Sequence, residues 1–144
     1  MSDPRIIASQ PAPQGLYVPA VRHGDIIFTA GMTPRQDGVL QFEGPLAAEA
    51  PPHEYREAIA LACKNALAAA RSQLGAAESI RRILSLTVYI AAEPGFAAHS
   101  KLADFASAYL RDKLGEGGIG SRAAVGVASL PGNAAVEIQL IAAL

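Results

Sequence analysis

The sequence predicts an α+β fold in which one mixed β-sheet is covered on one face by two helices. Strand-like and helical segments follow one another in the order strands, helix, strand, helix, two strands. Each helical segment has a single apolar stripe, so packing both helices on one sheet is the compact way to bury them. The length of 144 residues and the 51% hydrophobic content fit one domain over residues 1–144.

The N-terminal part of the chain predicts an irregular segment followed by two short strands. Residues 1–15 contain three prolines and a glycine, which disfavour regular structure. The segments LYVPAV (16–21) and DIIFTAG (25–31) carry the β-branched and aromatic residues of strands, with a turn at residues 23–25. Residues 33–52 mix prolines and glycines with the short apolar run VLQF, and they predict a turn, an edge strand and a loop.

The middle of the chain predicts two helices around a buried strand. From His53 to Leu74 apolar residues recur every three or four positions, as in an amphipathic helix, and Gly75 ends the pattern. The run RRILSLTVYIAA (81–92) shows little polar alternation and predicts a buried strand. Gly115 is placed to cap the second helix. The apolar stripe of that helix is Leu102, Phe105, Ala106, Tyr109, Leu110 and Leu114.

The C-terminal part predicts two strands joined by a tight turn. The strands are SRAAVGVAS (121–129) and AAVEIQLIAAL (134–144). In the turn LPGN between them, Pro131 fixes φ and Gly132 accepts a positive φ.

Three glycines before these strands, Gly115, Gly117 and Gly120, have the spacing G-x-G-x-x-G. A dinucleotide site needs such glycines after a strand and at the start of a helix, whose N–H groups then meet the pyrophosphate. Here the glycines follow a helix, and the C-terminal end of a helix dipole repels a phosphate. The spacing therefore favours a helix cap and a loop over a nucleotide site.

Composition argues against several classes of partner. Charged residues make up 17% of the chain and the formal net charge is −1, so no broad basic field exists to hold a nucleic acid. No apolar run approaches the roughly 20 residues of a membrane span. A single cysteine, Cys63, and an N-terminus without an apolar leader favour a soluble cytoplasmic protein. No metal-ligand spacing is found among the three histidines, His23, His53 and His99.

Arg122 is the first candidate functional residue. On a strand it shares a face with positions 124, 126 and 128, which are all small, so there is room beside the guanidinium. Arginine can clamp a carboxylate through two parallel hydrogen bonds. The alternative is a strand-start arginine whose head lies in solvent or in a surface ion pair. Spacing alone does not decide between them.

Glu137 is the second candidate, because it places a carboxylate in the middle of an apolar strand between Val136 and Ile138. Such a carboxylate can orient or deprotonate a water molecule. The alternative is that Glu137 lies on the solvent face of an edge strand.

The run SRAAVGVASLPGNAAVEIQLIAA resembles the closing segment of the YjgF/RidA family, with its strand-start arginine, Leu-Pro and Val-Glu-Ile strand. The run LYVPAVRHGDIIFTAGMTPRQDG resembles the family's opening tyrosine, glycine turn and Ser-Gly-Gln segment. The segments FAAHSKLADFASAYLRDKLGEGG and RAAVGVASLP are most similar to the branch described as endoribonuclease L-PSP-like. The resemblance covers the chain from about Gly15 onward, with the elements in the same order.

This resemblance implies a chorismate-mutase-like fold and a homotrimer with a barrel-like centre and a cleft at each subunit interface. It implies hydrolysis of reactive 2-imino or enamine acids to 2-keto acids and ammonia, without metal or organic cofactor. Arg122 falls on the arginine that binds the substrate carboxylate, and Glu137 on the glutamate that positions the attacking water. Tyr17 falls on the cleft tyrosine, for which plain strand packing is the alternative, and Gly31 on the glycine that lines the pocket.

The sequence departs from the family pattern around this pocket. Ala30, Gly31 and Met32 stand where the deaminases have Ser-Gly-Gln, and Ala124 stands where they have a cysteine or a similar residue. Two hypotheses follow: an imine hydrolase that depends on Arg122, and a trimeric protein that binds or senses small carboxylates without turnover. Ribonuclease activity is a weaker third hypothesis, because neither a basic groove nor a histidine pair supports it.

Overall fold

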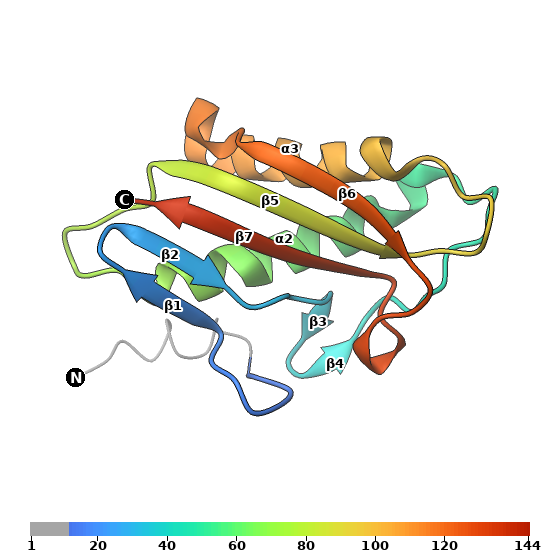
Figure 1. Cartoon of the computed structure of the whole chain (residues 1–144), viewed down its shortest axis with the longest axis horizontal. Helices are drawn as coiled ribbons and strands as arrows, with labels where there is room; N and C mark the ends of the chain where they lie inside the picture. Colours follow the sequence, from blue (N-terminus) through green and yellow to red (C-terminus); the bar gives the residue numbers. More distant parts are fainter. Residues whose placement is uncertain (1–11) are drawn as a thin grey trace.

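A computed structural model describes residues 12–144, and its main sheet has five strands in the order β1-β2-β7-β5-β6 (Figure 1). Strands β5 and β6 pair in parallel, while the other neighbours pair antiparallel, so the sheet is mixed as predicted. The strands are β1 (Ala20–His23), β2 (Ile26–Thr29), β5 (Arg82–Ala91), β6 (Ser121–Val127) and β7 (Val136–Ala143).

Two long helices, α2 (Arg56–Arg71) and α3 (His99–Leu114), cover one face of this sheet (Figure 1). This confirms the predicted arrangement of one mixed sheet with two helices. The core lies between the layers, where apolar side chains of the sheet meet the apolar stripes of both helices. Its largest fully buried members include Ile27, Ile59, Leu67, Val88, Ile90, Leu102, Leu110, Val136, Ile138 and Leu140. None of the helices within residues 12–144 has the length and apolarity needed to cross a membrane.

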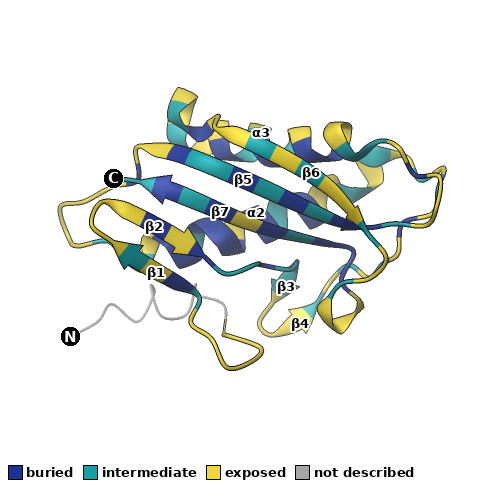
Figure 2. Cartoon of the chain, viewed as in Figure 1, coloured by how far each residue is buried: buried dark blue, intermediate teal, exposed yellow. Residues whose placement is uncertain are grey.

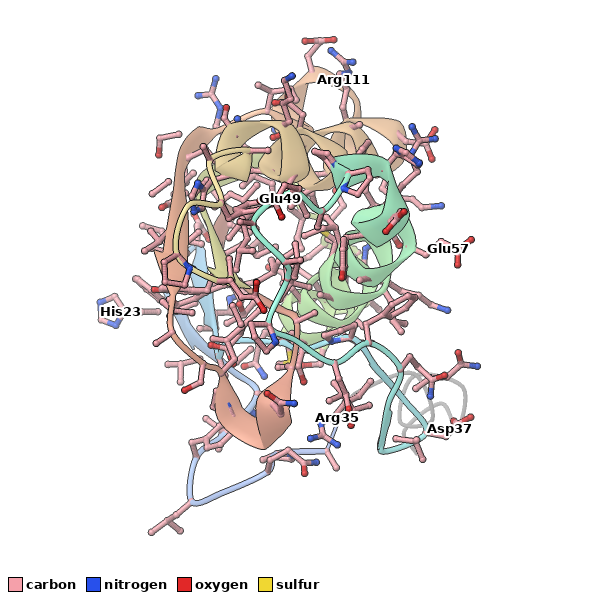
Figure 3. All side chains as sticks on the ribbon, turned by 90° about the vertical axis from the view of Figure 1, so that its right-hand side faces the viewer. His23, Arg35, Asp37, Glu49, Glu57 and Arg111 are labelled. Carbon is pink, nitrogen blue, oxygen red and sulfur yellow. The ribbon has the colours of Figure 1, made fainter. Side chains whose placement is uncertain are left out.

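No helix among residues 12–144 covers the opposite face of the sheet, and we refer to it as the open face. Burial alternates along β7, where Val136, Ile138 and Leu140 are buried beneath the helices while Glu137 and Gln139 are less buried (Figure 2). In the edge-on view of Figure 3, His23 on β1 points away from the helices. Successive side chains on one strand therefore alternate between the core beneath the helices and the open face.

The ends of several elements differ from their predicted positions. The first strand begins at Ala20 rather than at residue 16, because Pro19 has no N–H to donate and the segment before it runs free of the sheet. The predicted helix over residues 53–74 begins as a short 3₁₀ helix, η1 (Pro52–Tyr55), and ends at Arg71 rather than at Gly75. The predicted irregular segment at residues 1–15 can be followed only from residue 12, since residues 1–11 lie outside the described part.

The predicted edge strand VLQF is a two-residue strand outside the main sheet. It forms β4 (Val39–Leu40), which pairs with β3 (Arg35–Gln36) in a separate hairpin. Asp37 and Gly38 both have positive φ values, of 53° and 79°, which gives the tight turn that closes such a hairpin.

The glycine-rich segment after α3 has a packing role. Gly115 follows the last helical residue with φ of 70°, as predicted for a cap, and η2 (Gly115–Gly118) continues from it. A Cβ on Gly117 would overlap the carbonyl oxygen of Arg81, and one on Gly120 would overlap that of Ile83. The glycines thus allow close backbone packing at the C-terminal end of a helix, which agrees with the cap and loop interpretation. The turn before β7 is a third short helix, η3 (Pro131–Asn133), in which Gly132 has the predicted positive φ of 65°.

Candidate functional site

The sequence-predicted site residues line two separate hollows of the chain. The first, which we call the Glu137 hollow, has a volume of about 630 Å³. Its lining includes four predicted residues, Tyr17, Ala30, Gly31 and Glu137. The second, which we call the Arg122 hollow, has a volume of about 430 Å³ and includes Arg122 and Ala124. The two hollows have no lining residue in common.

Strand register explains why the two hollows are separate. Arg122 lies opposite Leu86 of β5, whose side chain is buried beneath the helices, so the arginine is on the helix-covered face. Glu137 lies opposite Tyr89 of β5, one position out of phase with the buried Val88 and Ile90, so it is on the open face. One chain alone therefore does not bring Arg122 and Glu137 together.

Arg122 is held by side chains of helix α3. Its Nη1 donates to Asp104 Oδ1 at 2.8 Å and to Ser107 Oγ at 3.0 Å, and its Nη2 donates to Ser100 Oγ at 3.0 Å. The arginine side chain is 22% exposed and the Asp104 side chain is 70% exposed, so the pair lies at the protein surface. A third hollow, of about 500 Å³ and also lined by Arg122, opens on the Asp104 side. The surface ion pair considered as the alternative for Arg122 is thus formed, beside a hollow.

His99 and Gly126 shape the other end of the Arg122 hollow. His99 is the first residue of α3, and its ring lies where a side chain on Gly126 would be, with Nε2 2.5 Å from an ideal Cβ. The Phe96 ring packs edge-on against the imidazole at 5.0 Å between centroids. The hollow therefore collects the Arg122 guanidinium, the start of α3 and an imidazole around a floor of small residues, a set of groups that suits an anion.

Glu137 lies directly against Gly31 in the first hollow. A Cβ on Gly31 would be only 2.7 Å from the carboxyl carbon and from Oε2 of Glu137, so a larger residue at this position would force the carboxylate to move. No residue among 12–144 is recorded donating a hydrogen bond to this carboxylate. Burial raises the pKa of Glu137, because desolvation disfavours its charged form. Glu137 is on the open face of the third strand of five, so the edge-strand alternative is wrong.

Tyr17 forms the rim of the Glu137 hollow rather than part of a strand. Its hydroxyl accepts a hydrogen bond from the Gln14 N–H at 3.0 Å, and the residue is 48% exposed. Tyr17 precedes β1, so the alternative of strand packing does not hold. The aromatic ring is placed to contact a ligand or a second protein surface.

The segment from Ala30 to Arg35 supplies one wall of the Glu137 hollow. Gly31, Thr33 and Arg35 line the hollow, whereas Met32 and Pro34 between them are buried. The side chain of Met32 therefore packs in the core and does not line the hollow. Ala30, the other departure from the expected Ser-Gly-Gln segment, does line it.

Sequence reasoning missed Arg35 and Thr33 as members of the hollow. A signal was present, because residues 31, 33 and 35 alternate with an apolar Met32 and a proline in an extended segment. This alternating pattern was not recognised, because the prolines and glycines around it predict a loop. Cys63 lies outside both hollows and is fully buried in the apolar stripe of α2.

Neither hollow has the residues of a metal centre. Across residues 12–144 no group of three His, Cys, Asp or Glu side chains gathers closely enough to hold a metal ion. The polar side chains that line the hollows include two arginines, a carboxylate, an imidazole and hydroxyls.

Comparisons with known proteins match nearly the whole chain. The family model described as endoribonuclease L-PSP matches residues 7–144. The protein TCP17 of Trypanosoma cruzi is 31% identical over 134 residues, which are 92% of this chain and 84% of that protein.

Solved structures agree in fold. A protein of unknown function from Agrobacterium tumefaciens is 34% identical with a TM-score of 0.82, over 90% of this chain and 82% of that one. A putative endoribonuclease from Shewanella oneidensis is 30% identical with a TM-score of 0.85, over 94% and 89% of the two chains. At lower identity the fold alone is shared with RidA of Psychrobacter (22%, TM-score 0.68, coverage 95% and 95%). The same holds for TdcF of Escherichia coli, solved with bound serine (23%, TM-score 0.70, coverage 95% and 94%).

Proposed function

The chain belongs to the endoribonuclease L-PSP family, which includes the YjgF and RidA proteins, and from this premise we propose that it hydrolyses 2-imino acids at a site shared by two copies of the chain. One copy provides the Glu137 hollow. The other copy provides Arg122 from strand β6. The products are a 2-keto acid and ammonium.

The single observation that carries the proposal is the state of Glu137. Its carboxylate is half-buried against Gly31, receives no hydrogen bond from residues 12–144, and has a raised pKa because of desolvation. A structural carboxylate in a sheet is normally exposed or paired, because burial of an unpaired charge costs stability. A desolvated carboxylate at the wall of a hollow is the arrangement expected of a general base.

The position of Arg122 supports a contribution from a second copy. Strand β6 is at an edge of the sheet, and the guanidinium is beside a hollow that opens to solvent. A neighbouring copy that docks its Glu137 hollow near this edge brings the cation and the carboxylate to one substrate. The guanidinium then fixes the substrate carboxylate, and orientation supplies a large part of the rate.

The hydrolysis needs no group beyond these residues and water. Glu137 accepts a proton from a water molecule as its oxygen attacks the iminium carbon, which gives a carbinolamine. The same carboxyl returns the proton to the nitrogen. The C–N bond then breaks and nitrogen leaves as ammonia, while the hydroxyl oxygen forms the keto C=O bond and releases its proton. That proton converts the ammonia to ammonium.

The apolar surface of the chain supports association of copies. Val21 and Phe28 on the open face are 52% and 44% exposed, and Leu16 and Val18 beside Tyr17 are 107% and 58% exposed. Exposed apolar side chains in one region mark a surface that another protein covers. The homotrimer implied by the family resemblance would cover it with further copies of this chain.

The size of the Glu137 hollow suits a small amino-acid derivative. The related TdcF structure contains a bound serine, which is the size of a short 2-imino acid. A volume of about 630 Å³ accommodates such a molecule together with water.

A carboxylate-binding function without turnover is the second candidate, and Ala30 favours it, because at this wall of the Glu137 hollow it offers no hydroxyl to polarise a substrate. Under either candidate a ligand meets the existing contacts of Arg122. Asp104, Ser100 and Ser107 already occupy the donors of the guanidinium. A substrate carboxylate has to compete with Asp104, whose carboxylate is the group it replaces. The Asp104→Asn variant removes this competitor, so under the hydrolase proposal it retains activity.

The test compares the decay of 2-iminobutanoate, generated by an amino-acid oxidase, in the presence of wild type and of the variants Arg122→Ala and Glu137→Gln. We expect the wild type to accelerate decay and each variant to reduce kcat/KM by about 100-fold or more, as for loss of a carboxylate clamp or a general base. Asp104→Asn serves as the matched control. Equal decay with wild type and Arg122→Ala would reject the hydrolase, and binding of a keto acid by the same wild type would then support the second candidate.

A further inference from the structure

Arg35 is a cation in the Glu137 hollow that the proposed reaction does not use. Among the described residues that line this hollow it is the sole positively charged one. Its Nη1 donates to the carbonyl oxygen of Gly38 at 3.1 Å, and it forms no ion pair with any residue from 12 to 144. By contrast, Arg22 and Arg122 both pair with carboxylates. The Nη2 edge of Arg35 is therefore available to an acidic ligand.

The turn before β7 makes room for this guanidinium. A Cβ on Gly132 would be 2.7 Å from Arg35 Nη2, so any side chain there would displace the cation. Gly132 also has a positive φ of 65°, which favours glycine independently. Figure 3 shows Arg35 in the space between the turn at residues 131–133 and the N-terminal loop. The guanidinium thus lies against backbone, where a ligand replaces water.

Helix α2 fixes the backbone that carries Arg35. The Asn65 amide donates from Nδ2 to the carbonyl oxygens of Thr33 at 3.0 Å and of Arg35 at 2.9 Å. Asn65 is 9% exposed and interrupts the otherwise apolar buried face of α2, so its amide has a specific partner rather than solvent. The two hydrogen bonds hold the segment at residues 33–35 in place, which prepares the cation before a ligand arrives.

We propose that Arg35 binds a second acidic group of the substrate, so that the Glu137 hollow selects 2-imino dicarboxylic acids over monocarboxylic ones. The inference rests on the proposed function, which gives the first carboxylate to Arg122 of a second copy. The second carboxylate accepts hydrogen bonds from Arg35, and the imine carbon between the two lies towards Glu137. A monocarboxylic acid leaves Arg35 without its partner, and a site built to bind an ionic group discriminates against ligands that lack it.

The test measures binding separately from turnover. Titration calorimetry gives the Kd of two stable keto acids, 2-oxoglutarate and 2-oxobutanoate, for wild type, Arg35→Met and Arg35→Lys. Arg71→Met, an exposed arginine at the end of α2, is the matched control. We expect wild type to bind 2-oxoglutarate more tightly than 2-oxobutanoate. The Arg35→Met variant should raise the Kd of 2-oxoglutarate by about 10- to 100-fold and change the Kd of 2-oxobutanoate by no more than about 3-fold. Arg35→Lys keeps the positive charge but cannot form bidentate hydrogen bonds, so it should lose less affinity for 2-oxoglutarate than Arg35→Met does.

The outcomes separate this inference from the proposed function. The role of Arg35 is overturned if wild type binds the two keto acids equally well, or if Arg35→Met loses affinity equally for both. This holds even if the wild type hydrolyses imines. A selective loss of affinity for 2-oxoglutarate in Arg35→Met supports the role of Arg35 even if wild type hydrolyses no imine. In that case the proposed reaction is wrong and the hollow is a dicarboxylate-binding site. Thermal unfolding of each variant verifies that Arg35→Met and Arg35→Lys are folded.

Discussion

The charge of Glu137 is unfavourable for stability and, under the proposed function, useful for chemistry. Its side chain lies between the wall formed by Gly31 and the open face, where fewer water molecules solvate the carboxylate. Burial raises its pKa, so the folded protein binds a proton at this site more tightly than the unfolded chain does. The stability that this group contributes is therefore present at low pH and is lost as pH rises through the folded-state pKa.

The Glu137→Gln variant tests the direction of this pH dependence of stability. Because the amide carries no charge to desolvate, we expect the variant to unfold at a higher temperature than wild type at neutral pH. The difference should shrink as pH falls below about 4.3, the ordinary value for glutamate, where both chains are uncharged at this position. Thermal unfolding followed by circular dichroism from pH 3 to pH 8 measures it. A variant that is less stable than wild type at neutral pH contradicts the desolvation argument.

At the residue scale the sequence could predict which side chains line the two hollows but not their hydrogen-bond partners. Arg122 and Glu137 were recognisable because a cation follows a glycine-rich segment and a carboxylate interrupts an apolar strand. The contacts of Arg122 with Ser100, Asp104 and Ser107 depend on how α3 packs beside β6, and no local pattern contains that information. Arg35 was missed because its role depends on Gly132, almost a hundred residues away.

Among the elements, strand β1 is attached to the loop after α2 by one ion pair. Arg22 donates from Nη1 and Nη2 to the two carboxylate oxygens of Glu78 at 2.5 and 2.7 Å, and Nη1 also donates to the Gln73 carbonyl at 3.2 Å. The Gly75 N–H donates to Glu78 Oε1 at 2.7 Å. The hydrogen bond with Arg22, reinforced by the one from Gly75, lowers the pKa of Glu78 to about 2. This cluster connects an edge strand of the sheet to the helical layer.

The Glu78→Gln variant measures what the cluster contributes. A carboxylate with a lowered pKa stabilises the fold at pH values above its unfolded-state pKa, and that contribution is lost as pH falls towards 2. We therefore expect the variant to unfold at a lower temperature than wild type at pH 7 and at nearly the same temperature at pH 2. Glu57→Gln is the control, because Glu57 projects from α2 and pairs with no residue among 12–144 (Figure 3). Equal stability of wild type and Glu78→Gln at pH 7 argues that solvent screening cancels the pair.

The sequence could predict helices and strands that have a clear hydrophobic periodicity. It could not predict boundaries and hairpins that depend on turn geometry. The apolar stripe of α2 and the strand at residues 82–91 follow from local hydrophobic spacing, and both form as expected. The end of α2 at Arg71 and the hairpin of β3 and β4 depend on capping and on two positive φ values, which hydrophobic periodicity does not report.

For the whole molecule the sheet has one face that the chain covers and one that it does not. The helices bury most of the inner face, except beside Arg122 on β6, while the open face keeps exposed Val21, Ile26, Phe28 and Val125 around Glu137 and Gln139. No helix or strand among residues 12–144 covers that face (Figure 2). Under the proposed function, association of copies covers this surface and completes the site.

The separation of Arg122 from Glu137 is a property of the whole sheet that local patterns do not contain. Each residue's face depends on its register with β5, and that register is fixed by contacts between segments far apart in the sequence. The resemblance to the family gave the expected residues and the expected oligomer. The register explains why those two expectations depend on each other.

The most direct measurement of this shared site is complementation between two inactive variants. Arg122→Ala and Glu137→Gln are each purified, mixed, unfolded and refolded together, and assayed for imine hydrolysis. If each site takes the arginine from one copy and the glutamate from another, random mixing restores about a quarter of the wild-type activity, because that fraction of sites receives both intact residues. No recovery of activity in a mixture that native mass spectrometry shows to contain hybrid oligomers would contradict the account.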